Sequence, residues 1–260
     1  MKKFFAVLLL LTACVLTACG SNQSAGNVVV IGVDDEFAPF AFRDEHGQII
    51  GFDIDLATET AKRMGVTFKF KPIDWNKKRA EITSGNVDII WNGLDINDER
   101  KEYMLFSKPY MDDSQILLVK KGHRQNIRSE SDLVGKIAGV QAGAASETFI
   151  NDNEKLRREI KEFKTYNKLR DAIDALKAES IDVFICDELI ARYEMRQSPD
   201  EFEIIPLLNG EVTEVGIGFR KDDVELRDRV QKAFDEIVAD GTAKKISEKW
   251  FDADLISFKQ

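Results

Sequence analysis

Residues 87–110 read VDIIWNGLDINDERKEYMLFSKPY, and this stretch decides the fold. Its first part, Val87–Trp91, is a short apolar run that predicts a buried strand ending at Asn92-Gly93. A polar segment that carries Arg100 follows. In open α/β sheets, small ligands bind at the carboxyl ends of the strands. We therefore expect this stretch to hold the carboxylate of a small amino acid. The simpler alternative is a strand, a loop and a solvated arginine.

Strand and helix patterns alternate before this stretch. Val28–Val33 and Val66–Phe70 are β-rich runs, and helical patterns cover Asp53–Met64 and residues near Lys77–Thr83. The alternation is typical of a parallel sheet with helices on its faces. The sequence thus predicts a first α/β lobe that is doubly wound.

A second α/β unit of similar size follows. Its strands are expected at Gln115–Val119, Ile137–Val140, Lys161–Thr165, Ile181–Cys186 and Phe202–Leu208, with helices at Asn167–Ala178 and Leu189–Met195. The chain closes with an expected strand at Val215–Phe219 and helices at Glu225–Asp240 and Ala243–Trp250.

The N-terminal residues are expected to direct export. Met1-Lys2-Lys3 is basic, and Phe4–Thr17 is an apolar run of signal-peptide length, too short to span a bilayer. Leu16-Thr17-Ala18-Cys19 resembles a bacterial lipobox, which makes residues 1–18 a signal peptide, Cys19 the lipidated residue and residues 19–27 a flexible tether. The alternative is an ordinary signal peptide with an incidental cysteine.

Composition narrows the function classes. The net charge is −9, and it becomes −11 once Lys2 and Lys3 leave with the signal peptide. An acidic exported chain is a poor candidate for binding nucleic acid, and an acidic cleft suits a cationic ligand. Of the three cysteines, only Cys186 remains in the folded part, so no intramolecular disulfide is expected.

Motifs for catalysis or metal binding are sparse. His46 and His123 each stand beside a glycine in a polar turn, and no metal or cofactor is expected. Binding chemistry fits better, because the guanidinium of Arg100 matches a carboxylate with two parallel bonds. Asp187, at the end of a predicted strand, supplies a carboxylate for an ammonium, or else caps the helix that follows.

The chain resembles the extracellular solute-binding proteins of amino-acid ABC transporters, the polar amino-acid (family 3) group. The resemblance covers essentially the whole mature sequence and rests on short motifs whose order and spacing agree. They are Asp34 with Phe37-Ala38-Pro39-Phe40, Gly51-Phe52-Asp53-Ile54-Asp55-Leu56, Ser84-Gly85 with Asp88, Trp91-Asn92-Gly93 with Asp98-Glu99-Arg100-Lys101, Phe106-Ser107-Lys108-Pro109-Tyr110, and Gly216-Ile217-Gly218-Phe219-Arg220-Lys221. It implies a periplasmic-binding-protein-like fold of type II. Two α/β lobes, residues 28–111 with 214–260 and residues 112–213, would be joined by a two-strand hinge.

By position, the resemblance also implies a ligand site between the lobes. Arg100 would hold the α-carboxylate with backbone groups of Gly93, Asp95 and Ala145, and Asp187 would take the α-ammonium. The side-chain pocket would be lined by Asp34, Phe37 and Phe52, with Trp91 and Gln141 nearby. Many relatives have Ser or Thr in place of Asp95, Asn97, Ala144 and Ala145, and the extra charge of Asp95 would repel a carboxylate.

We therefore expect a monomeric, lipid-anchored receptor at the outer face of the cell membrane. It would capture a free polar L-amino acid, with a preference for a basic one, and deliver it to an ABC transporter permease. Glutamine or cystine remains an alternative ligand, since residues like Asp34 also bind amides in relatives. Another alternative is an enzyme on the same fold, similar to cyclohexadienyl dehydratase. A sensor lobe is disfavoured, because no membrane helix follows in the sequence.

Overall fold

The structure is a computed structural model that describes residues 28–122, 126–207 and 212–257. The expected signal peptide (1–18), the tether (19–27) and Cys19 lie outside these residues, as do His123 and Leu208. No helix in the described part of the chain is long and apolar enough to cross a membrane.

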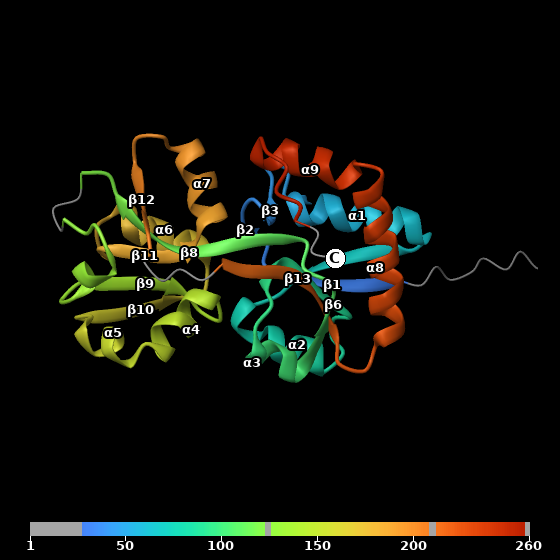
Figure 1. Cartoon of the computed structure of the whole chain (residues 1–260), viewed down its shortest axis with the longest axis horizontal. Coiled ribbons are helices and arrows are strands. Elements are labelled where there is room, and N and C mark those ends of the chain that lie inside the picture. The colour runs from blue at the N-terminus through green and yellow to red at the C-terminus, as the bar shows by residue number, and fades with distance from the viewer. Residues whose placement is uncertain (1–27, 123–125, 208–211, 258–260) are drawn as a thin grey trace, which may run out of the picture.

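One mixed sheet runs through the whole molecule. Its strand order is β10-β9-β11-β8-β13-β6-β1-β5, with β12 also paired to β8 and β7 to β13. The strands at each end of this order, β6-β1-β5 and β10-β9-β11, are parallel, as the alternation of strands and helices predicts. Figure 1 shows two lobes, each with helices on both sides of its strands, and β8 and β13 passing between them.

The first lobe contains the beginning and the end of the described chain. Its strands are β1 (Val28–Val33), β5 (Thr67–Pro72), β6 (Ile89–Asp95) and β7 (Met104–Phe106), with a small sheet of β2 (Glu36–Phe37), β3 (Ala41–Arg43) and β4 (Ile49–Ile50). Its helices are α1 (Phe52–Met64), the short 3-10 helix η1 (Trp75–Lys77), α2 (Lys78–Thr83), α3 (Asp98–Tyr103), α8 (Val224–Ala239) and α9 (Thr242–Phe251).

The second lobe is built from the middle of the chain. Its strands are β9 (Ile137–Gln141), β10 (Glu162–Tyr166), β11 (Val183–Asp187) and β12 (Phe202–Pro206). Its helices are the 3-10 helix η2 (Glu130–Leu133), α4 (Ala145–Asp152), α5 (Glu154–Glu159), α6 (Leu169–Lys177) and α7 (Glu188–Gln197).

The crossing strands β8 (Met111–Lys120) and β13 (Val212–Arg220) join the lobes. Met111 to Ser114 of β8 pair antiparallel with β13, whereas Gln115 to Leu118 pair with β11. β8 therefore changes partner between Ser114 and Gln115, at the boundary between the lobes. This pairing supports the proposed division near residues 112 and 213.

Helix α1 shows how local sequence signals fix one element. Asp55 lies in its first turn and Lys62 and Arg63 in its last, so these charges complement the helix dipole, each by about 0.3–1 kcal/mol. Gly65 ends the helix with φ = 65°, a left-handed conformation that favours glycine. The sequence prediction for this helix is confirmed.

The stretch 87–110 differs from its prediction in the bounds of the strand, which begins at Ile89 rather than Val87, and in the polar segment after it. β6 does not end at Asn92-Gly93 but continues through Asp95, and all seven of its residues are buried. The reason is β13, which pairs with Leu94 and Asp95 and so supplies backbone partners beyond the glycine. The polar segment that follows forms α3, whose first turn is capped by the Asn97 side chain, with Oδ1 accepting from the Arg100 N–H at 2.8 Å.

Candidate ligand-binding site between the lobes

Polar side chains gather where parallel strands of both lobes end. Asp34 follows β1 and Asp95 ends β6 in the first lobe, while Gln141 ends β9 and Asp187 ends β11 in the second. Carboxyl ends of parallel strands are where open α/β sheets bind ligands. The structure brings these two edges together, because side chains from one lobe contact the other directly.

Asp34 and Gln141 make one of these contacts. Gln141 Nε2 donates a hydrogen bond of 2.6 Å to Asp34 Oδ2, and the Glu36 N–H donates to Asp34 Oδ1 at 3.0 Å. Burial raises the pKa of the Asp34 carboxyl to about 6, although both hydrogen bonds favour the ionised form. This carboxylate is thus held in a site that a cation would stabilise.

Arg100 lies at the first lobe's side of the same space. Its side chain is 3% exposed, with Nη1 donating to the Asp95 carbonyl at 2.8 Å and Nη2 to the Gly143 carbonyl of the second lobe at 3.3 Å. The Asp95 carboxylate lies 3.6 Å from Nη1. The sequence prediction brought Asp95 close to the site, and the structure pairs it with Arg100 within the first lobe.

Asp187 is buried on the second lobe's side. Its Oδ1 accepts a hydrogen bond from Gln115 Nε2, and no side-chain cap from Asp187 to α7 is present. Burial, and then the charge of Asp95, raise the pKa of Asp187 to about 7. Asp113 is buried nearby, and burial together with Asp187 raises its pKa well above the usual range. The charge of Arg100 favours the ionised form of Asp187, but burial and Asp95 outweigh it, so ionising both buried carboxyl groups is costly.

Two buried amide oxygens accompany these carboxylates. Within the described residues, Gln115 Oε1 and Gln141 Oε1 have no hydrogen-bond partner. Buried acceptors of this kind cost free energy until a donor reaches them. Because Gln141 adjoins Asp34 and Gln115 adjoins Asp187, each acidic position also has a free acceptor beside it.

Aromatic rings border the site, but not all those expected do so. Phe37 and Trp75 face each other with ring centroids 6.4 Å apart and an interplanar angle of 15°. By contrast, Phe52 packs against Phe251 at 4.9 Å in the core, and Trp91 packs against Phe234 at 5.8 Å. The structure therefore pairs Phe37 with Trp75, which sequence reasoning missed, and keeps Phe52 and Trp91 in the apolar interior.

Gly93 and Ala145 were expected to contribute backbone groups, rather than side chains, to the site. The Gly93 N–H donates to Asp53 Oδ2 at 2.6 Å, so this donor already has a partner inside the first lobe. Ala145 is the first residue of α4 and lines a groove of about 550 Å³ together with Asp95 and Gln115. The predicted residues thus divide into those that meet at the interlobe surface and those that support it from the core.

Lys78 is a charged residue that sequence reasoning missed, as is Asp113. Lys78 opens α2, is 6% exposed, and its Nζ donates to the Gly143 carbonyl at 2.6 Å. A lysine in a short polar segment normally indicates a solvated face, so only its spacing from Trp75, one helical turn away, could have indicated this position.

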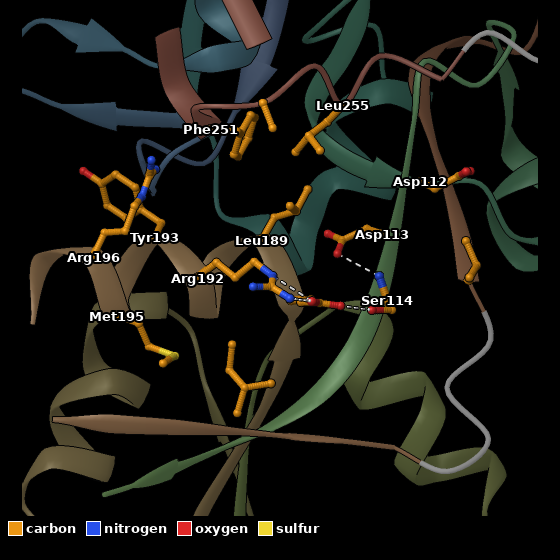
Figure 2. Close-up of a pocket in the computed structure, with 14 residues that line it drawn as sticks. Asp112, Asp113, Ser114, Leu189, Arg192, Tyr193, Met195, Arg196, Phe251 and Leu255 are labelled. Carbon is orange, nitrogen blue, oxygen red and sulfur yellow. Dashed lines mark hydrogen bonds and ion pairs between the residues drawn. The ribbon is translucent and has the colours of Figure 1, made fainter. Parts of the chain in front are cut away.

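A second groove between the lobes adjoins this site at Asp113 but lies beyond the ten predicted ligand-binding residues. Figure 2 shows it beside α7, with a hydrogen-bonded chain from Ser114 through Glu188 to Arg192 and with Phe251 and Leu255 of the first lobe opposite. Its volume is about 750 Å³, and none of the ten predicted ligand-binding residues lines it. The predicted site is therefore a different part of the interlobe surface.

Two curated amino-acid-binding proteins are similar to this chain over most of its length. The L-cystine-binding protein TcyJ of Escherichia coli strain K12 is 32% identical over 232 residues, which are 87% of this chain and 84% of that protein. The arginine-binding extracellular protein ArtP of Bacillus subtilis strain 168 is 32% identical over 96% of this chain and 98% of its own.

A solved structure shows the same fold. It is the substrate-binding protein of an ABC uptake transporter from Streptococcus pneumoniae with bound histidine, 34% identical, with a TM-score of 0.85. The match covers 89% of this chain and 95% of that one, so the expected two-lobe, type II periplasmic-binding-protein-like fold is confirmed. Residues 29–253 match the bacterial extracellular solute-binding proteins, family 3. This chain therefore belongs to that family, whose named relatives here bind amino acids.

Proposed function

We propose that this protein captures a basic L-amino acid between its lobes and delivers it to the permease of an ABC importer. We propose further that it is held at the outer face of the cell membrane by lipid on Cys19. Family membership supports capture and delivery, and the lipobox-like Leu16-Thr17-Ala18-Cys19 supports the anchor.

The observation that carries the choice of ligand is the pair of acidic positions, Asp34 and Asp187. They come from different lobes, both are buried, and neither forms an ion pair within 4 Å with another described residue, although the charge of Arg100 acts on Asp187. Each has an unpartnered amide oxygen at its neighbour, Gln141 Oε1 or Gln115 Oε1. Two such positions call for two cationic donor groups on one ligand. A basic amino acid has these, its α-ammonium and its side-chain cation.

The remaining contacts follow from the same assignment. Arg100 faces the second lobe at Gly143 and supplies donors for the α-carboxylate. Phe37 and Trp75 present nearly parallel ring faces, and the face of an aromatic ring attracts a cation. The α-ammonium is assigned to Asp187 and the side-chain cation to Asp34.

Other ligands and an enzymatic activity are the alternatives to this proposal. Named relatives bind cystine, arginine or histidine, so the family alone does not select the side chain. Glutamine would place a neutral amide at Asp34 and leave that carboxylate without a counter-ion. An enzyme on this fold would turn over a bound acid, which prolonged incubation with product analysis detects.

A thermal-shift screen of the mature protein tests the proposal. L-Arginine, L-lysine and L-histidine are compared with L-glutamine and L-cystine at equal concentrations. A ligand at 100 times its Kd adds about 2.7 kcal/mol, which raises the Tm by roughly 5–10 °C. The proposal predicts this shift for at least one basic amino acid. A shift with glutamine or cystine alone contradicts it.

A further inference from the structure

Lys78 stands in an unusual electrostatic position for a lysine. It is the first residue of α2, at the positive end of the helix dipole, where a cation is disfavoured. Its ammonium lies 5.0 Å from the centroid of the Trp75 ring and also donates to the Trp75 carbonyl at 3.3 Å. Neither the helix nor the surface accounts for a cation buried at this point.

Two cations converge on one neutral acceptor across the lobes. Lys78 Nζ lies 2.6 Å from the Gly143 carbonyl oxygen, and Arg100 Nη2 lies 3.3 Å from the same atom. A carbonyl oxygen offers no charge to balance them. A carboxylate at this position would offer one oxygen to each cation.

Asp95 explains why a second cation is needed. Its carboxylate lies 3.6 Å from Arg100 Nη1 with both side chains buried, so it offsets most of the charge that Arg100 would present to an anion. The sum of Arg100 and Asp95 is near zero, and Lys78 returns the local charge to about +1. The three residues together match the charge of a lone arginine.

We propose that Lys78 is a second contact for the α-carboxylate of the ligand, and that it offsets the charge of Asp95. This inference rests on the proposed function, since it assumes an amino acid between the lobes. It assigns the carboxylate end of the site to two side chains of the first lobe, Arg100 and Lys78, that meet the second lobe at Gly143.

The arrangement has a consequence for pH. Burial, and then repulsion by Arg100, lower the pKa of Lys78 to about 7, while Glu99 of α3, Glu147 of α4 and Asp95 of β6 favour its charged form. A bound carboxylate favours the ammonium further. Above pH 7, binding must therefore recharge Lys78, and ligand affinity falls as the pH rises.

Calorimetric titration of four proteins tests the proposal: wild type, Lys78→Met, Asp95→Ser and the double variant. Lys77→Met is the matched control, because Lys77 is the adjacent exposed lysine, paired with Asp74 at 3.0 Å. The probe is L-arginine, or, where the wild type does not bind it, whichever of L-lysine, L-histidine, glutamine and cystine it does bind. Each of these carries the α-carboxylate that Lys78 is proposed to contact.

Lys78→Met is expected to raise the Kd about tenfold or more, and Lys77→Met to leave it unchanged. With Asp95→Ser already present, the same loss of Lys78 is expected to cost no more than about threefold. A Kd for Lys78→Met within twofold of the wild-type value, or a lower one, overturns the contact. If Lys78→Met weakens binding equally in the wild type and in the Asp95→Ser variant, the claim that Lys78 offsets the charge of Asp95 is overturned.

The wild-type pH profile gives a second measurement that depends less on the fold of a variant. Between pH 7 and 8.5 the wild-type affinity is expected to fall several-fold relative to that of Lys78→Met. If the affinities of the wild type and of Lys78→Met change with pH in the same way, the proposal is overturned. Binding of glutamine or cystine but not of a basic amino acid contradicts only the ligand assignment above, and failure of the wild type to bind any of these amino acids contradicts both.

Discussion

The side chains of Asp34 and Gln141 come from different lobes and are joined by a hydrogen bond of 2.6 Å between Oδ2 and Nε2. This bond links the carboxyl end of β1 to that of β9. One partner is the Asp34 carboxylate, which a cation would stabilise, and the other is the Gln141 amide, whose oxygen Oε1 has no hydrogen-bond partner. A cationic group of the ligand could satisfy both.

Asp34→Asn is expected to change the ligand preference. Loss of the carboxylate removes the proposed counter-ion for a basic side chain, so the Kd for L-arginine should rise about tenfold or more, while binding of glutamine is kept. Titration calorimetry measures both. Asp35→Asn is the control, because Asp35 pairs with Arg43 on the surface. Equal losses for arginine and glutamine would contradict the assignment.

The ligand-free protein is expected to lose stability as the pH rises from about 4 to 7. The pKa values of Asp34 and Asp187 are raised to about 6 and about 7, so between their unfolded and folded values the native state binds more protons than the unfolded state. The Tm should fall across this range. Lys78 has the opposite effect at higher pH: because its pKa is lowered to about 7, its contribution to stability increases as the pH rises above 7.

Asp187→Asn tests this origin of the pH dependence. The variant should show a flatter Tm profile than the wild type between pH 4 and 7. L-Arginine should give a larger Tm shift at pH 7.5 than at pH 5, since the cation binds the ionised carboxylates. A shift that is larger at pH 5 would argue against carboxylate recognition.

Gly143→Ala is expected to weaken binding through the lobe contact. A Cβ on Gly143 would lie 2.9 Å from Lys78 Nζ and 3.0 Å from Asn76 Cα, and its φ of 74° favours glycine. Gly135→Ala is a close control, because Gly135 has φ = 72° but nothing within 4 Å of the added Cβ. Both should lose about 1–2 kcal/mol of stability to backbone strain. Only Gly143→Ala should also raise the Kd, as titration of the two variants would show.

Cys19→Ala is expected to release the protein from the membrane. Without a thiol at the proposed lipidation site, the protein should move from the membrane fraction to the soluble fraction of cells, as followed by immunoblotting. Cys14→Ala, a cysteine within the proposed signal peptide, should leave it in the membrane fraction. An unchanged distribution for Cys19→Ala would contradict the anchor.

Sequence patterns predicted most of the fold, because the buried parallel strands are short apolar runs and the helices between them carry recognisable ends. The patterns failed where pairing with a strand distant in the sequence determines the bounds of an element. The extension of β6 to Asp95 depends on β13, which is far away in the chain. Helix α3 has five charged residues and Tyr103, which is too little apolar periodicity to distinguish it from a loop.

The candidate site was predictable only in part. Asp34, Arg100 and Asp187 combine a strand or helix end with a charge, and the structure buries all three near the lobe boundary. Phe52 and Trp75 are both aromatic residues beside turns, and nothing local tells which one faces Phe37. Lys78 was missed because its ammonium binds the carbonyl of Gly143, a residue of the other lobe.

The position of β13 in the sheet also determines the order in which the two lobes can fold. β6 lies between β1 and β13, yet β8 to β12 are all synthesised between β6 and β13. Until residues 212–220 exist, the newly made first lobe has an open strand edge, which is prone to pairing with other chains. The second lobe is continuous from β8 to β12, so it can finish folding before the lobe that precedes it.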